Sequence, residues 1–373
     1  MVVTAVGRDC QPDPSASDVS APLFQVVDFF CGCGGTSLGL QEAGGAILLG
    51  IDWDHDAGQT FQANFPDAAF LEEDISELDV EAIAPYVQES AAIPLVFSGC
   101  APCQPFSQQN AQRGRADERS VLLEHFARFV RAYLPQVIFV ENVPGIRDYG
   151  VRSPLDRFLA VLRHHGYRCQ IETLDARDYG VPQRRRRLFL LASRLGRLSF
   201  PEATHGPSRL ASYTTVGQTI DDLPPLKAGE QHPVIPNHAT WDLSPTNLAR
   251  IQGTPPDGGR LDWPAGFRLD CHSDLQGYSD VYGRLRRDRP ASAMTTRCVS
   301  LSNGRFGHPS QDRAISAREA ARIQTFADDF VFHGSLTSVA RQIGNAVPVA
   351  LARAMGLAVA DHLILHAART QDA

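Results

Sequence analysis

Four short apolar runs, each ended by glycine or polar residues, constrain the fold of this chain most strongly. They lie at residues 23–30, 46–51, 95–97 and 137–140, and segments with apolar residues at helical spacing separate them. A short continuous apolar run bounded by turn residues is typical of a strand buried on both faces of a parallel sheet. Alternation of such strands with helices predicts an α/β protein.

The first of these strands is followed by a glycine turn, Gly32-Cys33-Gly34-Gly35, and then by a predicted helix at 36–43. Glycines let a backbone approach a ligand closely, and the helix N-terminus presents free amides. The second strand is followed by Asp52, about 20 residues after the turn, where a carboxylate can accept hydrogen bonds from a ribose. Strand, glycine turn, helix, strand and acid is the order of a nucleotide-type binding half.

Two details limit which cofactor this turn could bind. The turn lacks the G-x-G-x-x-G spacing, which favours a cofactor without a pyrophosphate, although Asp52 suits NAD as well as S-adenosylmethionine. Trp53 is either an aromatic residue that stacks on an adenine or an ordinary core side chain.

A second candidate site is the stretch Gly99-Cys100-Ala101-Pro102-Cys103, which ends the apolar run at 95–97. Ligands of open α/β sheets bind outside the carboxyl ends of the strands, so a cysteine at this position is a candidate nucleophile. Cys100 and Cys103 also form a C-x-x-C pair, which is equally compatible with a redox pair or half of a zinc site.

Charged residues end two further predicted strands. Glu141 ends the run at 137–140, where a carboxylate costs free energy unless it is paired or functional. Arginines at 184–187 lead into an apolar run at 188–192; side chains alternate in a strand, so Gln183, Arg185 and Arg187 are expected on one face.

Together these motifs resemble the cytosine-C5 DNA methyltransferase family. Seven sequence blocks occur in the order of the family: 28–35, 102–107, 141–143, 178–182, the Gln183-x-Arg185-x-Arg187 pattern, 318–324 and 344–348. One block could arise by chance, but seven in order could not. The resemblance covers residues 25–200 and 282–355 and departs from the family pattern at Cys100, where the family usually has glycine.

The resemblance implies a reaction and its residues. Cys103 would add to C6 of a cytosine flipped out of the duplex, Glu141 would hold the base at N3 and the exocyclic amine, and Arg187 would position it. S-adenosylmethionine would donate the methyl group and leave as S-adenosylhomocysteine. The implied catalytic residues are Cys103, Glu141, Arg187, Arg185 and Gln183; the substrate residues are Pro102, Gln104, Ser107 and Asn142; the cofactor residues are Phe30, Gly32, Gly34, Gly35, Asp52, Trp53, Asp74, Ile75, Leu122, Asn345 and Val347.

The same resemblance implies a Rossmann-like methyltransferase sheet with helices on both faces, plus a small loop-rich target-recognition domain. The composition changes near Gly196: Pro, Gly, His and Asn become frequent, and the apolar residues show no clear helical or strand period until about Gly283. We therefore expect a tail at 1–22, a catalytic and cofactor-binding domain at 23–195, the recognition domain at 196–283, and a return segment at 284–373 that completes the catalytic domain.

Composition limits the partners. A formal net charge of −7 and an isoelectric point near 5.9 exclude a chain that coats nucleic acid indiscriminately, although a local basic groove is compatible with them. We find no stretch apolar enough to span a bilayer and no secretory pattern, and the eight cysteines suit a reducing cytoplasm. The expected protein is a monomer of the bacterial cytoplasm and nucleoid that acts on double-stranded DNA, binds no membrane, and serves a restriction–modification system with a cognate endonuclease or works as a solitary methylase.

Two alternatives remain at this point. One is a tRNA cytosine-5 methyltransferase on the same scaffold, which the large 196–283 insert disfavours. The other is a non-catalytic redox or zinc protein, in which Cys31 and Cys33 could join Cys100 and Cys103. A four-thiolate zinc site would consume the nucleophile, so no metal is expected.

Overall fold

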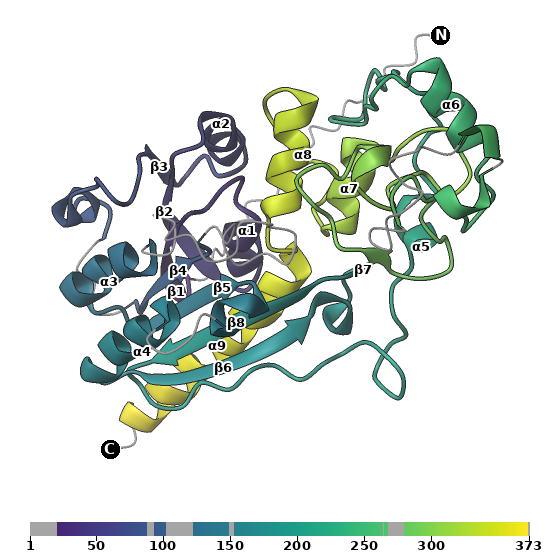
Figure 1. Ribbon diagram of the computed structural model, residues 1–373. Helices are drawn as coiled ribbons and strands as arrows, with labels where there is room; N and C mark the ends of the chain where they lie inside the picture. Colours follow the sequence, from purple (N-terminus) through teal and green to yellow (C-terminus); the bar gives the residue numbers. More distant parts are fainter. Residues whose placement is uncertain are drawn as a thin grey trace, which may run out of the picture.

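A seven-stranded sheet forms the centre of the larger lobe. The computed structural model describes residues 21–87, 93–101, 122–148, 153–263, 265–267 and 280–371. The strand order is β3-β2-β1-β4-β5-β8-β6, and β8 alone runs antiparallel to both of its neighbours (Figure 1). The strands are β1 (Phe24–Phe29), β2 (Gly45–Asp52), β3 (Ala69–Glu72), β4 (Leu95–Gly99), β5 (Val137–Asn142), β6 (Arg168–Asp175) and β8 (Arg186–Ser193).

Helices cover both faces of this sheet, which confirms the predicted fold class. One buried cluster joins α1, α2 and α9 to the sheet, and a second joins α3, α4 and the short 3-10 helix η1 to the opposite face. The helices are α1 (Gly35–Glu42), α2 (His55–Asn64), η1 (Val80–Ile83), α3 (Leu122–Tyr133), η4 (Pro144–Asp148), α4 (Pro154–His164) and α9 (Val349–Gln371).

The strands form where the apolar runs predicted them. Every residue of β1 and of β5 is buried, as expected for parallel strands covered on both faces. On the second face, Phe29 of β1 packs against Phe126 and Phe129 of α3 with ring centroids 5.0 Å apart. Ser153 and Asp156 form a reciprocal capping box that begins α4.

The strand order places a topological switch point between β1 and β4. From β1 the chain goes outward to β2 and β3, and it then returns to add β4 and β5 on the other side. The carboxyl ends of these five parallel strands lie at one edge, which is where α/β sheets bind ligands. Because β8 is antiparallel to β5, the first residues of β8 lie at this same edge.

A smaller, loop-rich lobe lies beside the sheet (Figure 1). It contains α5, α6 and α7, and the two-stranded sheet of β7 and β9 lies at its base. Helix α7 belongs to the predicted return segment, yet it packs against α5 of the predicted insert, so part of the return segment completes this lobe. The elements are β7 (Gln183–Arg184), α5 (Val216–Ile220), α6 (Pro245–Gln252), β9 (Ala291–Ser292), α7 (Ala317–Ile323) and α8 (Leu336–Asn345).

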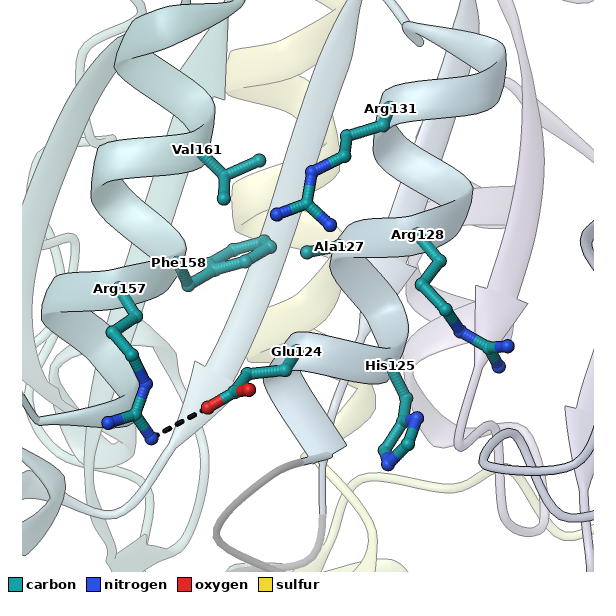
Figure 2. A pocket seen from close by; sticks show the side chains of 8 residues that line it. All are labelled: Glu124, His125, Ala127, Arg128, Arg131, Arg157, Phe158 and Val161. Carbon is teal, nitrogen blue, oxygen red and sulfur yellow. Dashed lines mark ion pairs between the residues drawn. The ribbon is translucent and has the colours of Figure 1, made fainter.

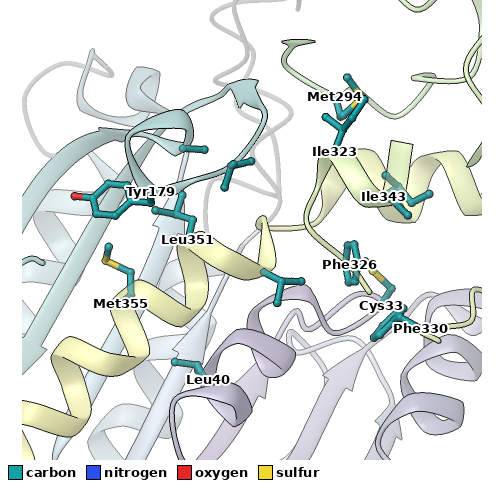
Figure 3. Close-up of a cluster of buried hydrophobic side chains, with 14 of the residues drawn as sticks. Cys33, Leu40, Tyr179, Met294, Ile323, Phe326, Phe330, Ile343, Leu351 and Met355 are labelled. Atoms are coloured by element: carbon teal, nitrogen blue, oxygen red, sulfur yellow. The ribbon is translucent and has the colours of Figure 1, made fainter. Parts of the chain in front are cut away.

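A continuous apolar core joins the two lobes. Figure 3 shows Met294 and Ile323 at the smaller lobe, Ile343 of α8, and Leu351 and Met355 of α9 within one cluster. The return segment therefore passes from the smaller lobe, through α8, into the long helix that packs on α1. The sequence pattern did not predict helix α8, although Ser335 caps its first turn.

One stretch corrects the expectation about membranes. Residues Leu336–Thr370, which cover α8 and nearly all of α9, contain an 18-residue window with a mean hydropathy of 1.5 and are long and apolar enough to span a bilayer. The window is 67% buried inside the protein, and a core helix of a soluble protein has the same properties. Packing of α9 against α1 accounts for much of its apolar composition.

Charged side chains are buried where the smaller lobe meets the return segment. Arg313 and Glu319 are fully enclosed and form a bidentate ion pair at 2.7 and 2.8 Å. The ring of His308 lies 3.6 Å from Glu319, and its Nδ1 accepts hydrogen bonds from the backbone N–H groups of Ser310 and Gln311. The pKa of His308 is lowered to about 4, chiefly by burial and also by the Arg313 and Arg284 charges, while the Glu319 charge opposes this shift.

This arrangement predicts a loss of stability in acid. The pKa of His308 is about 4 in the folded chain and 6.5 in an unfolded one, so between these values the unfolded chain binds more protons. The free energy of unfolding should therefore fall as the pH decreases from 6.5 to 4, by about 3 kcal/mol from this residue. Urea unfolding at a series of pH values measures it.

The control is His308→Asn, whose amide oxygen can accept the same two backbone hydrogen bonds without titrating. The variant should be less stable than the wild type near pH 7 and should show a flatter stability profile between pH 6.5 and 4. Parallel profiles would contradict the assignment to His308.

Candidate active site

The centre of the candidate site is an ion pair between neighbouring strands. Glu141 stands near the end of β5, and Arg187 is the second residue of the antiparallel β8. Nε of Arg187 lies 2.9 Å from Oε1 of Glu141, and these side chains are 20% and 8% exposed. A carboxylate this buried needs a partner, and Arg187 supplies a planar, permanently charged one. The pair stands at the ligand-binding edge with part of the arginine open to solvent.

Gln183 and Arg185 contact a different part of the chain from Arg187. The predicted continuous strand is interrupted at Arg185, since β7 ends at Arg184 and β8 begins at Arg186. Both side chains are buried and bind the return segment, whereas Arg187 contacts Glu141, so the role expected for Gln183 and Arg185 beside the base stays a prediction.

Their hydrogen bonds show what they hold. Gln183 donates to the carbonyl of Ile323 and to the side chain of Gln324, and it accepts from the N–H of Met294. Arg185 donates to the carbonyls of Met294 and Gly344, at 2.8 and 3.0 Å. A buried amide or guanidinium bound in this way fixes the surrounding backbone. Both residues attach the return segment to the catalytic sheet.

Asn142 supports the turn that leads toward Cys103. Its side-chain amide is buried, donates to the carbonyl of Ala101 at 3.4 Å and accepts from the N–H of Val143 at 2.9 Å. It thus connects the end of β5 to the residue two positions before Cys103. The predicted nucleophile and three predicted substrate residues lie outside the described residues: Cys103, Pro102, Gln104 and Ser107.

The glycine turn has the backbone shape that its composition predicts. Gly32 and Gly34 have φ values of +52° and +94°, and Phe30 before them also has a positive φ of 58°. The N–H of Gly32 donates to Oδ2 of Asp52 at 2.8 Å, which joins the turn to the end of β2. A side chain added at Gly32 would meet open space, so the turn is accessible from outside.

Asp52 and Trp53 stand beside this turn. Oδ1 of Asp52 accepts from the N–H of Asp54 at 3.0 Å, and burial raises the pKa of the Asp52 carboxyl. The N–H of Trp53 also interacts with this carboxylate, and since a carboxylate has about four acceptor positions, acceptor capacity remains for a hydroxyl donor. Trp53 is 71% exposed, which excludes the core interpretation and leaves its ring free for stacking.

The remaining predicted cofactor residues surround the same edge of the sheet. Ile75 is buried and Asp74 is exposed in the turn after β3, and Leu122 is the first residue of α3. A side chain on Gly35 would come within 2.6 Å of the carbonyl of Val347, so the start of α1 and the return segment are in contact. Asn345 ends α8 and lies two residues before Val347.

Three of the described cysteines, Cys31, Cys33 and Cys100, lie near the site. Burial raises the pKa of Cys33 to about 12, and it raises those of Cys31 and Cys100 well above the ordinary value. Sγ of Cys100 lies 3.3 Å from the hydroxyl of Thr36. Among the described residues, no group of three or more His, Cys, Asp or Glu is arranged to hold a metal ion.

A cavity of about 480 Å³ between α3 and α4 lies apart from these residues (Figure 2). Glu124 of α3 and Arg157 of α4 form an ion pair across it at 2.6 Å. None of the predicted site residues lines it, so we assign it no part in the reaction. The lining residues are Glu124, His125, Ala127, Arg128, Arg131, Arg157, Phe158 and Val161.

Comparison with known proteins agrees with this geometry. The family profile described as C-5 cytosine-specific DNA methylase matches residues 24–360. The chain belongs to this family. It is 39% identical over 343 residues to the Type II methylase M.HgiDII of Herpetosiphon aurantiacus, covering 90% of this chain and 94% of that one. It is 32% identical to the Type II methyltransferase M1.HphI of Haemophilus parahaemolyticus, covering 89% and 86%.

A solved structure supports the fold of this methylase. A candidate DNA modification methyltransferase encoded within an Escherichia coli prophage superimposes with a TM-score of 0.67 at 24% identity, covering 91% of this chain and 99% of that one. Family membership makes the chain an enzyme, a DNA (cytosine-5-)-methyltransferase, and rejects the alternative of a non-catalytic redox or zinc protein.

Sequence reasoning missed two residues that shape the methylase site. The side chain of Gln324 donates to the carbonyl of Ala346 and accepts a hydrogen bond from the side-chain amide of Gln183. It therefore joins its own family block, 318–324, to the block at 344–348. Thr36 contacts Cys100, the residue at which the chain departs from the family pattern. Gln324 could have been suspected from its place in the 318–324 block, whereas no local signal indicates the contact of Thr36.

The Glu141–Arg187 pair predicts strongly non-additive mutants. Arg187→Met leaves the buried Glu141 carboxylate without its cation and should lower the free energy of unfolding by about 3 kcal/mol. In a Glu141→Gln background no buried charge remains, so adding Arg187→Met there should lower the free energy of unfolding much less. Chemical denaturation of the wild type, both single variants and the double variant measures the coupling. Additive free energies would contradict the ion pair.

Proposed function

We propose that this methylase transfers a methyl group from S-adenosylmethionine to C5 of a cytosine flipped out of a specific duplex DNA sequence, through a covalent adduct with Cys103. The observation that carries the proposal is the buried Glu141–Arg187 pair at the ligand-binding edge, in a chain of this family that carries Pro102-Cys103-Gln104. Family members depend on S-adenosylmethionine in general.

The residues present fit this cofactor. The accessible turn at Gly32 suits close approach of a ligand without a pyrophosphate, the Asp52 carboxylate has acceptor capacity left for a ribose hydroxyl, and the exposed Trp53 ring suits an adenine. Asp74, Ile75 and Leu122 would bound the adenine end. When bound, the cofactor supplies an electrophilic methyl group on a sulfonium.

The mechanism follows from the chemistry of the side chains. The thiolate of Cys103 forms a bond to C6 of the cytosine, which moves electron density to C5 and N3. Glu141 binds N3 and the exocyclic amine and offsets the charge that develops on the ring. Arg187 keeps Glu141 in place and positions the base. C5 would take up the methyl group that the bound cofactor supplies. A base or water would then accept the C5 proton, and the electron pair of the C5–H bond would restore the C5–C6 double bond and release Cys103 as a thiolate.

The smaller lobe is proposed to read the DNA. The base must leave the stack to reach the site, and direct readout in the major groove would come from residues of the 196–283 insert. Among the arginines of this insert, Arg260 is buried, and Arg250 stacks over Trp263 and Tyr282 and donates to the carbonyl of Phe267. Arg209 is exposed and remains a candidate, and Arg268 lies outside the described residues.

The biological setting is proposed from the relatives. Those compared above are called Type II methylases or methyltransferases. We propose that this chain acts as a monomer in the bacterial cytoplasm at the nucleoid, and that it protects host DNA from a cognate restriction endonuclease without binding it. We also propose that the target-recognition domain begins at residue 196 and that the return segment begins at residue 284.

The decisive experiment is bisulfite sequencing of host DNA after expression of the wild type. Protected cytosines in one sequence context are expected, and they identify the target site. Parallel assays with labelled S-adenosylmethionine on duplex DNA and on tRNA compare the two substrates. Soluble, folded protein that leaves DNA unmethylated, or that labels tRNA alone, would overturn the proposal.

The nucleophile is tested by trapping on duplex DNA with 5-fluorocytosine at the target position. Wild type should form a covalent complex, because fluorine at C5 cannot leave as a proton does. Cys103→Ser should form none. Cys100→Ser is the matched control three residues away and should retain trapping, since the raised pKa of Cys100 keeps its thiol protonated. The complex is scored by denaturing gel electrophoresis; loss of trapping in the control alone would reverse the assignment.

A further inference from the structure

A second arginine, remote from the reacting base, holds the turn after β3. Nη2 of Arg128 in α3 lies 2.6 Å from the carbonyl oxygen of Ile75 and 3.2 Å from that of Leu78, with a longer contact of 3.5 Å to Ser76. Three carbonyls of one short segment thus converge on one guanidinium nitrogen. We propose that Arg128 is a positioning residue that sets the S-adenosylmethionine affinity of this methylase by fixing the turn at Asp74 and Ile75. The inference rests on the proposed cofactor.

The chemistry of the contact suits this role. A guanidinium donates charge-assisted hydrogen bonds, which are stronger than neutral ones. Among the described residues no carboxylate forms an ion pair with Arg128; its Nη2 donates to the carbonyls of the turn, and its buried Nε has no hydrogen-bond partner there. Figure 2 shows that the Arg128 side chain points away from Arg157 and Phe158. It lies on the opposite side of α3 from the ion pair between Glu124 and Arg157.

The turn is otherwise held mainly by its own short-range bonds. The carbonyl of Asp74 accepts from the N–H groups of Glu77 and Leu78, and its side chain accepts from the N–H of Ser76. The N–H of Glu73 also donates to the carbonyl of Asp52 at 3.1 Å, which attaches the start of the turn to the end of β2. Burial of Ile75 in the second core cluster and the hydrogen bonds from Arg128 attach the rest of the turn to α3 and the sheet.

Helix α3 also connects this turn to the rest of the proposed cofactor site. Leu122, at the start of α3, precedes Arg128 by six residues, or about 9 Å of helix. Helix α3 carries Leu122 and, through Arg128, holds the turn that contains Asp74 and Ile75. A rigid helix therefore keeps the spacing of these three proposed cofactor residues constant. Preformed spacing lowers the ordering cost of binding, so its loss should weaken cofactor affinity rather than the chemical step.

The experiment compares four variants with the wild type. Arg128→Ala removes all three contacts, and Arg128→Lys keeps the charge and part of the reach. Arg131→Ala removes an exposed arginine of the same helix for which no hydrogen bond is found among the described residues. Tyr133→Phe removes a bond from α3 to the carbonyl of Val80, five residues beyond Ile75. Thermal unfolding checks that each variant is folded.

Steady-state methylation of duplex DNA and calorimetric titration with S-adenosylhomocysteine provide the readouts. We expect Arg128→Ala to raise the KM for S-adenosylmethionine and the Kd for S-adenosylhomocysteine about tenfold, with kcat and the KM for DNA changed less than about threefold. Arg128→Lys should recover part of the affinity. Arg131→Ala and Tyr133→Phe should bind the cofactor as the wild type does, even if Tyr133→Phe is less stable.

The outcomes separate this inference from the proposed function. If folded Arg128→Ala has wild-type KM and Kd values, or loses kcat alone, the positioning role is wrong while the proposed function stands. If Tyr133→Phe loses cofactor affinity as strongly as Arg128→Ala, general loosening of the segment explains the effect and the inference also fails. If the wild type itself neither binds S-adenosylhomocysteine nor methylates DNA, the proposed function fails first.

Discussion

The antiparallel pairing of β8 with β5 is the constraint on which the candidate site depends. Glu141 would be an unfavourable residue in a fully buried strand, and a parallel neighbour would bring its own amino end to the opposite edge. Because β8 runs against β5, its second residue, Arg187, meets Glu141 at the carboxyl edge. The reversed strand therefore places a permanent cation beside a buried carboxylate without a long loop, and it does so where the sheet binds ligands.

Buried arginines and amides also carry out structural work throughout this methylase. Arg185 and Gln183 bind backbone groups of the return segment, Arg313 pairs with Glu319 within the smaller lobe, and Arg128 binds the turn after β3. Except for Arg313 and Glu319, which are six residues apart, each joins segments far apart in the sequence. A guanidinium has five donors in a fixed plane, so one side chain can satisfy several carbonyls that no strand or helix would pair. Arg187 of the candidate site is thus one member of a larger set.

Much of the fold and part of the site could be predicted from local patterns. The apolar runs located β1, β2, β4 and β5, and the glycine turn with Asp52 indicated a cofactor edge whose Gly32–Asp52 hydrogen bond the structure contains. Local patterns were insufficient where contacts between residues far apart in the sequence decide the structure. Alternation placed Gln183, Arg185 and Arg187 on one face, but the strand breaks at Arg185, because Gln183 and Arg185 bind the return segment. Helix α8 was missed, and Trp53 could not be assigned to core or surface.

The sequence by itself determined the α/β class, the ligand-binding edge and the residue types of the chemistry, because buried strands, glycine turns and terminal acids are local signals that depend on backbone sterics and apolar burial. Only the tertiary structure decided which of several arginines faces Glu141, that the return segment completes the smaller lobe, and that Arg128 reaches the turn after β3. Those outcomes depend on hydrogen bonds between residues tens to more than a hundred positions apart, and an arginine in a sequence carries no mark of the carbonyl or carboxylate it will meet after folding.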